Sequence, residues 1–120
     1  MPHARIDMHE ALRPRMAEIS AAILKGMVKG LDMPEDDLFQ IFRLHQAGEL
    51  VFSRTHPGKA DRQDIIFIEI LGSPNYSAEQ MKRGLTAISE EVVKLGIKRD
   101  NLLLMVTPAN AWLSPVEASA

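Results

Sequence analysis

Hydrophobic and polar residues follow two different periods along the first part of the chain, and each period predicts one element. Hydrophobic residues at alternate positions predict a strand over residues 3–8 (HARIDM). From about Pro14 they recur at spacings of three and four, which is typical of a helix with one buried stripe. We expect this helix to end between Gly30 and Pro34 and to pack against a sheet.

The second half of the chain repeats this order of patterns. Residues 64–71 (DIIFIEIL) are almost continuously hydrophobic, which predicts a central strand covered on both faces. Ser77 and Gln80 have the spacing of a capping box, and the helix that they open is expected to close at Gly96. A last strand is predicted over residues 101–106 (NLLLMV).

Two more strand candidates and a loop lie between these patterns. The strand candidates are residues 38–45 (LFQIFRLH) and the shorter segment 49–53 (ELVFS). The segment from Thr55 to Gln63 contains proline and glycine and is predicted to be a loop.

These elements form two β-α-β units, over about residues 2–53 and 62–107, with a C-terminal tail at 108–120. A chain of 120 residues fits a single domain. The helical stripes of the two units align when Leu24 is matched to Ile88. Two architectures are open at this point: a ferredoxin-like sandwich, and two parallel β-α-β units side by side in one four-stranded sheet.

Composition and charge narrow the classes of function. The formal net charge of −2 offers no basic face for a nucleic acid. The chain has no cysteine, which excludes disulfides and thiolate nucleophiles, and its four histidines show no metal-ligand spacing. No run approaches the ~18 hydrophobic residues of a membrane span. We therefore expect a cytoplasmic protein without a cofactor, a metal, or a nucleic-acid or membrane partner.

Pro2 is the first residue with distinctive chemistry. A proline in second position normally permits removal of the initiator methionine, and its nitrogen then becomes a secondary amine at the chain terminus. An unperturbed α-amino group has a pKa of about 7.7 to 8.0, so this amine can accept and donate a proton near neutrality. Burial would lower its pKa and favour a base, whereas nearby carboxylates would keep it cationic and favour an acid.

A pattern of residues downstream connects this proline to a known family. The pattern is Pro-Glu-x-Asp-x-aromatic-Gln, followed by His-x-x-Gly-Glu, and it occurs together with the segments PHARIDM and RQDIIFIEI. With these motifs the chain resembles the tautomerase superfamily over about residues 2–107, and within it the malonate semialdehyde decarboxylase-like branch. The matching residues are Pro34, Glu35, Asp37, Phe39, Gln40, His45, Gly48 and Glu49.

The resemblance implies both a fold and a mechanism. The implied fold is α/β, with two β-α-β units forming a four-stranded mixed sheet that carries two helices on one face, and the implied assembly is a homotrimer. Pro2 is implied as the general acid or base that acts on a small carboxylate substrate, and Asp37 as a second catalytic residue. His45 is expected to be a hydrogen-bonded structural residue.

The chain departs from this branch in the loop before its second helix. The branch has arginines there that bind the substrate carboxylate, whereas this chain has Ser73, Asn75 and Tyr76. A guanidinium group is the natural partner of a carboxylate, so Arg13 and Arg62 are the residues that we expect to replace those arginines.

Two aromatic residues complete the predicted site. Members of the branch close their site with a Trp-Ser-Phe-Gly type segment, whereas this chain ends in NAWLSPVEASA. We expect Trp112 either to wall the pocket or to pack at a subunit boundary. Tyr76 is expected to contact the substrate.

The predicted function is that of a cofactor-independent tautomerase, an isomerase that uses Pro2 for the enol–keto conversion of a small 2-oxo or enol carboxylic acid. Decarboxylation or hydration of a malonate semialdehyde-like 3-oxo acid, a lyase activity, is the alternative within the enzyme class. A non-catalytic trimeric binding protein and a regulatory ferredoxin-like module are the alternatives outside it.

Overall fold

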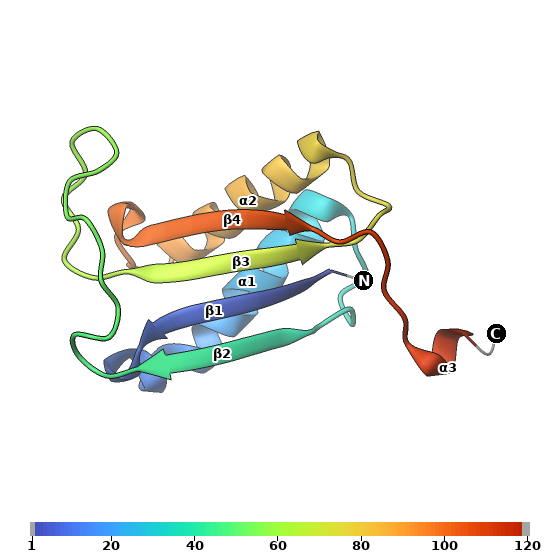
Figure 1. Cartoon of the computed structure of the whole chain (residues 1–120), viewed down its shortest axis with the longest axis horizontal. Helices are drawn as coiled ribbons and strands as arrows, with labels where there is room; N and C mark the ends of the chain where they lie inside the picture. Colours follow the sequence, from blue (N-terminus) through green and yellow to red (C-terminus); the bar gives the residue numbers. More distant parts are fainter. Residues whose placement is uncertain (1, 119–120) are drawn as a thin grey trace.

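The computed structural model describes residues 2–118, and it consists of one mixed sheet with two long helices on one of its faces (Figure 1). The main elements are β1 His3–His9, α1 Met16–Leu31, β2 Gln40–His45, β3 Ile66–Gly72, α2 Ala78–Val93 and β4 Leu102–Pro108. The shorter elements are the 3₁₀ helices η1 Glu10–Arg15 and η2 Arg99–Asn101, and the helix α3 Pro115–Ala118.

The strand order is β2-β1-β3-β4. β1 runs parallel to β2, β3 runs parallel to β4, and the two central strands β1 and β3 are antiparallel. Parallel neighbours need a crossover connection, which α1 and α2 supply. The arrangement of two β-α-β units in one mixed sheet is therefore confirmed, and the ferredoxin-like sandwich is excluded.

The predicted strand at residues 49–53 is wrong. The carbonyl of Ser53 accepts a hydrogen bond from the Arg62 guanidinium at 2.9 Å, and the backbone N–H of Arg62 donates to the carbonyl of Arg54 at 2.9 Å. The side chain of Val51 is 87% exposed. The backbone partners of this segment thus come from its own loop and not from a neighbouring strand.

The first helix begins later than predicted. Pro14 lies inside η1, which turns the chain away from the sheet, and α1 begins at Met16. The helix ends at Leu31, within the predicted range, because Asp32 adopts the left-handed conformation with φ 54°. At the second helix the predicted capping box is present, since the Ser77 hydroxyl accepts from the backbone N–H of Gln80.

The core lies between the sheet and the two helices. Alternate residues of β1 and β3 are buried on the side that the helices cover, as the two-residue period of a strand requires. The helices approach each other closely because α1 carries glycine at the crossing. A Cβ atom at Gly26 would lie 2.4 Å from Cα of Ile88, and one at Gly30 would lie 2.6 Å from Cα of Gly84. The largest fully buried side chains include Ile6, Met8, Ile23, Met27, Ile68, Ile70, Ile88 and Val92.

The buried carboxylate of Glu91 ties α2 to α1. It lies 2.8 Å from Nζ of Lys94, 3.4 Å from Nζ of Lys29 and 3.6 Å from Nζ of Lys25. The hydrogen bond from Lys94 lowers the pKa of Glu91 to about 2, against the opposing effect of burial. Because two of these lysines belong to α1, the ionised carboxylate links the helices at neutral pH.

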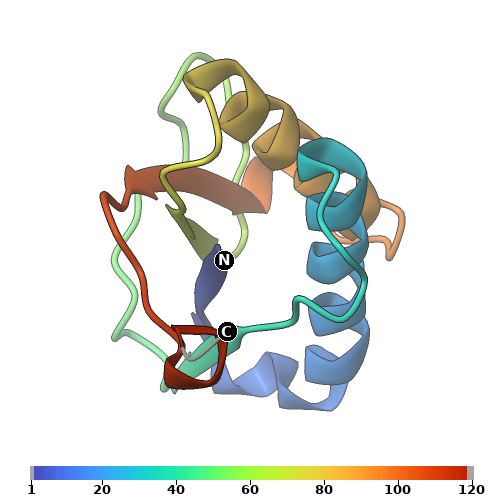
Figure 2. The ribbon, with the colours of Figure 1, turned by 90° about the vertical axis from the view of Figure 1, so that its right-hand side faces the viewer.

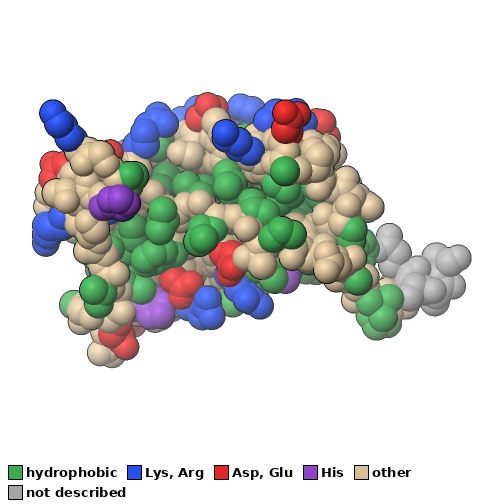
Figure 3. Space-filling model, turned by 45° about the horizontal axis from the view of Figure 1, so that its top comes forward, with side chains coloured by type: hydrophobic (Ala, Val, Ile, Leu, Met, Phe, Trp, Pro, Cys, Tyr) green, Lys and Arg blue, Asp and Glu red, His purple; other side chains and the backbone are tan. Residues whose placement is uncertain are grey.

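The other face of the sheet is uncovered in the single chain. Hydrophobic side chains gather over the middle of the visible surface, and charged ones gather along its upper edge (Figure 3). The uncovered face includes Ile41, Leu103 and Met105, of which Met105 is 61% exposed. It also carries the pair of Arg5 with Glu69, with 4.0 Å between nitrogen and oxygen. Across residues 2–118, no helix is long and hydrophobic enough to span a membrane.

Candidate active site

Pro2 and Asp37 emerge at the same end of the sheet because β1 and β2 are parallel. Ala4 is paired with Gln40, and the backbone N–H of Ala4 donates to the carbonyl of Phe39 at 3.0 Å. Pro2 is buried at the start of β1. Asp37 is half-buried and closes a turn in which its N–H donates to the carbonyl of Pro34 at 3.1 Å. The parallel pairing therefore places both predicted catalytic residues at this end.

Three segments surround the start of β1 at this end, as the view in Figure 2 shows. They are the connection from α1 to β2, the loop from β3 to α2, and the C-terminal tail after β4. His3 is paired with Leu71, and an extension of this antiparallel register by one residue would bring Pro2 opposite Gly72. The loop between β3 and α2 is thus one strand away from Pro2.

Tyr76 lies in this loop and is half-buried. Burial raises the pKa of its hydroxyl, and the negative charges of Asp37 and Asp32 raise it further. The hydroxyl therefore keeps its proton at neutral pH and can donate a hydrogen bond.

A slot of about 500 Å³ opens between α2 and the end of β4, next to this loop. We call it the α2–β4 slot. Its lining is mostly hydrophobic and contains two distinctive polar groups. Ser73 is only 6% exposed, and its hydroxyl makes no hydrogen bond within the described chain. Lys82, on the first turns of α2, is the one charged residue in the lining. The remaining lining residues are Gly72, Tyr76, Ala78, Met81, Leu85, Val106 and Pro108.

The two arginines that were expected to bind a carboxylate lie at the opposite end of the sheet. Arg13 follows β1 and lies beyond His9, which is itself roughly 23 Å from Pro2 at about 3.3 Å per strand residue. Its guanidinium is 3.6 Å from the carboxylate of Glu10. Within one chain, Arg13 and Pro2 are therefore not brought together.

Arg62 is buried, with 6% of its surface exposed. Its Nη1 donates to the carbonyl of Ser53 at 2.9 Å and also to the carbonyl of His56. These contacts hold the loop that precedes β3, again at the end away from Pro2. The geometry gives Arg62 a structural role in the chain.

Trp112 follows β4 in the C-terminal tail. The tail is tied to the candidate site at its start, where the N–H of Ala109 donates to the carbonyl of Gly72 at 3.0 Å. Trp112 itself is 37% exposed and does not line the α2–β4 slot. Its role as a pocket wall or as a subunit contact stays a prediction.

The end of the sheet away from Pro2 holds a set of paired polar side chains. Nε2 of His45 lies 2.7 Å from Oδ1 of Asp7, and the guanidinium of Arg43 lies 3.0 Å from Oδ2. Burial raises the pKa of Asp7, but the hydrogen bonds from His45 and Arg43 outweigh it and lower the pKa below its usual value. His45 is therefore hydrogen-bonded, as predicted. Nδ1 of His9 lies 2.6 Å from Oδ1 of Asp64.

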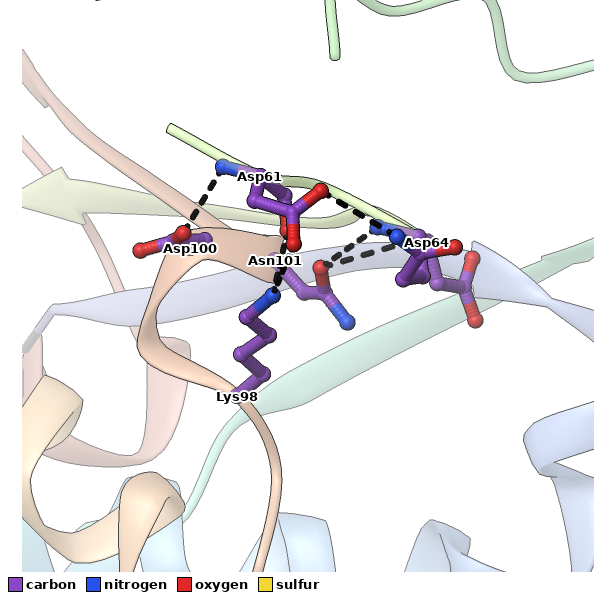
Figure 4. Close-up of polar contacts among 6 residues, drawn as sticks. Asp61, Asp64, Lys98, Asp100 and Asn101 are labelled. Atoms are coloured by element: carbon purple, nitrogen blue, oxygen red, sulfur yellow. Dashed lines mark hydrogen bonds and ion pairs between the residues drawn. The ribbon is translucent and has the colours of Figure 1, made fainter. Parts of the chain in front are cut away.

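A second group of contacts at this end joins the segment before β3 to η2 (Figure 4). The backbone N–H of Asp61 donates to the carboxylate of Asp100 at 2.8 Å, and Nζ of Lys98 donates to the carboxylate of Asp61 at 3.0 Å. The side-chain oxygen of Asn101 accepts from the backbone N–H of Asp64 at 3.4 Å. Despite these carboxylates, no three His, Asp or Glu side chains within residues 2–118 are grouped to hold a metal ion.

Comparisons with known proteins agree with this fold. Residues 37–111 match the family model described as tautomerase enzyme, and the chain belongs to this family. The probable tautomerase YusQ of Bacillus subtilis (strain 168) is 22% identical over 92 residues, which cover 76% of this chain and 72% of that protein.

Solved structures show the same architecture. The FG41 malonate semialdehyde decarboxylase inhibited by 3-bromopropiolate has a TM-score of 0.79 at 21% identity, covering 88% of this chain and 82% of that chain. A fused 4-OT, described as a symmetric trimer, has a TM-score of 0.70 at 10% identity, covering 89% of this chain and 85% of that chain. At these identities the likeness establishes the fold.

Two residues of the candidate site were not predicted from the sequence. In the sequence, Ser73 is distinctive only because the family has arginines in this loop. The spacing of Lys82 predicts a charged residue on the exposed face of an amphipathic helix. Both become distinctive only when α2 packs beside β4 and forms the slot. The sequence held one indication of Lys82: the loop lacks the family's arginines, so a substrate carboxylate would need another cation.

Proposed function

We propose that this protein is a cofactor-independent tautomerase in which the amine of Pro2 moves a proton between oxygen and carbon of a small 2-oxo or enol carboxylic acid. The observation that carries the proposal is the burial of Pro2 at the end of the sheet where Asp37 and Tyr76 also lie. An amine, a carboxylate and a protonated phenol are a sufficient set for proton transfer.

Each of the three groups has a distinct part in the proposed reaction. The neutral amine of Pro2 takes the proton of the enol hydroxyl, and the resulting cation returns a proton to the neighbouring carbon as the carbonyl forms. Asp37 favours the cationic form of Pro2 by its negative charge. Tyr76 donates a hydrogen bond to the substrate oxygen, where negative charge develops during the transfer.

Decarboxylation of a malonate semialdehyde-like 3-oxo acid is the second candidate. It is supported by the combination of Pro2 and Asp37, because a cationic amine beside a carboxylate can polarise a carbonyl. The replacement of the branch arginines by Ser73 and Asn75 argues against it. Release of carbon dioxide from the 3-oxo acid distinguishes this reaction from tautomerisation, which releases nothing.

We also propose that the uncovered face of the sheet is buried in a homotrimer. Exposed hydrophobic side chains on neighbouring strands, among them Ile41, Leu103 and Met105, form a surface that water does not solvate well. A mass of three times 13.4 kDa by light scattering would support the trimer. A mass of 13.4 kDa at micromolar concentration would contradict it.

The role of Pro2 is tested in two steps. Intact-mass measurement first establishes whether Met1 is removed, since only then does Pro2 carry a free amine. Ketonisation of phenylenolpyruvate is then followed for the wild type and for Pro2→Ala. We expect kcat/KM to fall by about a hundredfold or more, the usual contribution of a positioned proton carrier, with an unchanged circular dichroism spectrum. Retention of Met1, or equal rates in the two proteins, would exclude the proposed mechanism.

A further inference from the structure

The α2–β4 slot has the position and the lining of a substrate-binding pocket. Gly72 lines it, and Gly72 directly follows Leu71, which is paired with His3, the residue after Pro2. Gly72 has no side chain, and the space above it is filled by the end of Met81, whose Cε would lie 3.1 Å from an added Cβ. Methionine is flexible, so this boundary between Pro2 and the slot can adapt to a ligand.

Lys82 is the one positively charged residue that lines the slot. Its ammonium makes no hydrogen bond or ion pair with any residue in the range 2–118, whereas the other lysines of the helix pair are occupied. Lys29 and Lys94 both contact Glu91. Arg83, its neighbour on α2, does not line the slot. A cation at the edge of a hydrophobic pocket without a protein partner is suited to a ligand carboxylate.

Ser73, which directly follows Gly72, adds a polar group to the lining. Ser73 is buried, with 6% of its surface exposed, and its hydroxyl has no hydrogen-bond partner within the described chain. A buried hydroxyl without a partner costs free energy, which a bound ligand oxygen would recover. The hydrophobic slot thus has two groups, the Ser73 hydroxyl and the Lys82 ammonium, that can bind the oxygen atoms of a ligand.

We propose that the α2–β4 slot binds the substrate of the reaction proposed above, with Lys82 pairing with the carboxylate and with Leu85 and Val106 contacting a hydrophobic group. Lys82 then takes the place of the missing loop arginines as the residue that selects a carboxylic acid. This inference rests on the proposed function for the identity of the substrate. The binding of a hydrophobic carboxylate, however, is a property of the slot itself.

Binding is measured with two probes that undergo no reaction, hydrocinnamate and its neutral amide hydrocinnamide, by the chemical shifts of the Gly72 and Ser73 backbone amides. For Lys82→Ala we expect about tenfold weaker binding of the carboxylate, the loss of one charge-assisted hydrogen bond, and no change for the amide. Lys82→Arg keeps the charge and should bind hydrocinnamate within about threefold of the wild type. The matched control Arg83→Ala removes a cation from the same helix without touching the slot and should leave both affinities unchanged.

A second variant tests the slot independently of charge. Val106→Phe adds volume to the lining, and we expect it to weaken both probes about equally, because the hydrophobic group no longer fits. The unfolding midpoint of this variant shows whether it is folded. If Val106→Phe does not fold, the comparison of Lys82→Ala with Arg83→Ala still decides the proposal.

The outcomes separate the slot from the catalytic mechanism. Equal hydrocinnamate affinities for the wild type and Lys82→Ala, or shifts confined to residues outside the slot, would overturn the inference even if Pro2→Ala abolishes turnover. Conversely, the expected binding results together with an inactive wild type would support the slot and contradict the proposed function. With an active enzyme, Lys82→Ala should raise KM about tenfold and change kcat little, because the carboxylate does not react.

Discussion

The two ends of the sheet contain similar kinds of polar residues but differ in how those residues are satisfied. At the end away from Pro2, Asp7 has His45 and Arg43 as partners, and Arg62 is bonded to backbone carbonyls. At the Pro2 end, the Ser73 hydroxyl is buried without a partner among the described residues, and the Lys82 ammonium has none either. The end away from Pro2 is therefore held by paired polar groups, whereas the Pro2 end has two groups, Ser73 and Lys82, that a ligand can bind.

This difference indicates which residues should affect stability and which should affect activity. Removing one member of a hydrogen-bonded pair leaves the other member unpaired, which lowers the free energy of unfolding. Removing a group that has no protein partner costs little stability but takes away a contact for the ligand. The strongest test compares Asp37, which is proposed to act on Pro2, with Asp7, which is paired with His45 and Arg43.

Asp37→Asn should have the largest effect on activity of the substitutions considered in this comparison. The amide cannot favour the cationic form of Pro2, so we expect kcat/KM for phenylenolpyruvate to fall by about a hundredfold. The pH at which the rate changes should also move down, because the pKa of the Pro2 amine falls when the neighbouring negative charge is lost. Steady-state rates between pH 5 and 9 measure both effects.

Asp7→Asn is the matched control at the opposite end. It keeps the size of the side chain and removes the charge that pairs with His45 and Arg43. We expect its kcat/KM to equal that of the wild type, with a loss of about 1 to 3 kcal/mol in the free energy of unfolding. If Asp7→Asn lost activity as strongly as Asp37→Asn, the division between a structural and a functional end would be wrong.

Arg62→Met should give the next largest effect, on stability alone. Methionine fills a similar volume but cannot donate to the carbonyls of Ser53 and His56, so we expect the free energy of unfolding to fall by about 2 kcal/mol. Urea denaturation measures this change, and KM should be unaffected. The exposed Arg13→Ala is the comparison variant, with little expected effect on stability.

The Arg62 and Arg13 variants also test the prediction, made from the sequence, that these arginines bind the substrate carboxylate. A higher KM in Arg62→Met without a loss of stability would restore the carboxylate-binding role and contradict the structural one. A higher KM in Arg13→Ala would indicate that the site is completed by a neighbouring copy, because Arg13 lies at the far end of its own sheet.

The sequence predicted the parts of this molecule that local patterns determine. The alternation in β1 follows from the burial of one face, and both strands were located to within about two residues. The prediction that β3 is covered on both faces does not hold within one chain, where only alternate residues of β3 are buried. The segment 49–53 has the same local pattern as a strand, yet its partners are Arg62 and the loop, which no window of neighbouring residues contains. The error arose because strand pairing is a long-range property.

The candidate site shows the same difference between what a sequence pattern marks and what depends on long-range packing. Pro2 and Asp37 were predicted because a family pattern marks their positions, and the parallel register of β1 and β2 brings them to one end. Arg62 was expected to replace the missing loop arginines, but its burial against carbonyls was not visible in the sequence. Lys82 was missed because its significance depends on the packing of α2 beside β4.

The smallest expected effect is the pH dependence of stability contributed by Asp7. Its pKa in the folded chain lies below the usual 3.8, because hydrogen bonds from His45 and Arg43 outweigh the effect of burial. A carboxyl group with a lowered folded pKa stabilises the fold fully above its unfolded pKa. This contribution is lost as the pH falls below about 4 and the folded carboxyl takes up a proton.

The urea midpoint of the wild type should therefore fall more steeply below pH 4 than that of Asp7→Asn. Glu91, with its folded pKa of about 2, titrates in the same range but is present in both proteins. The difference between the two curves thus reports on Asp7 and its pairs with His45 and Arg43, and it should shrink as the pH falls from 5 toward 3. Parallel curves over the whole range would mean that Asp7 is not held as an anion by His45 and Arg43, and the end of the sheet away from Pro2 would then owe its stability to uncharged contacts.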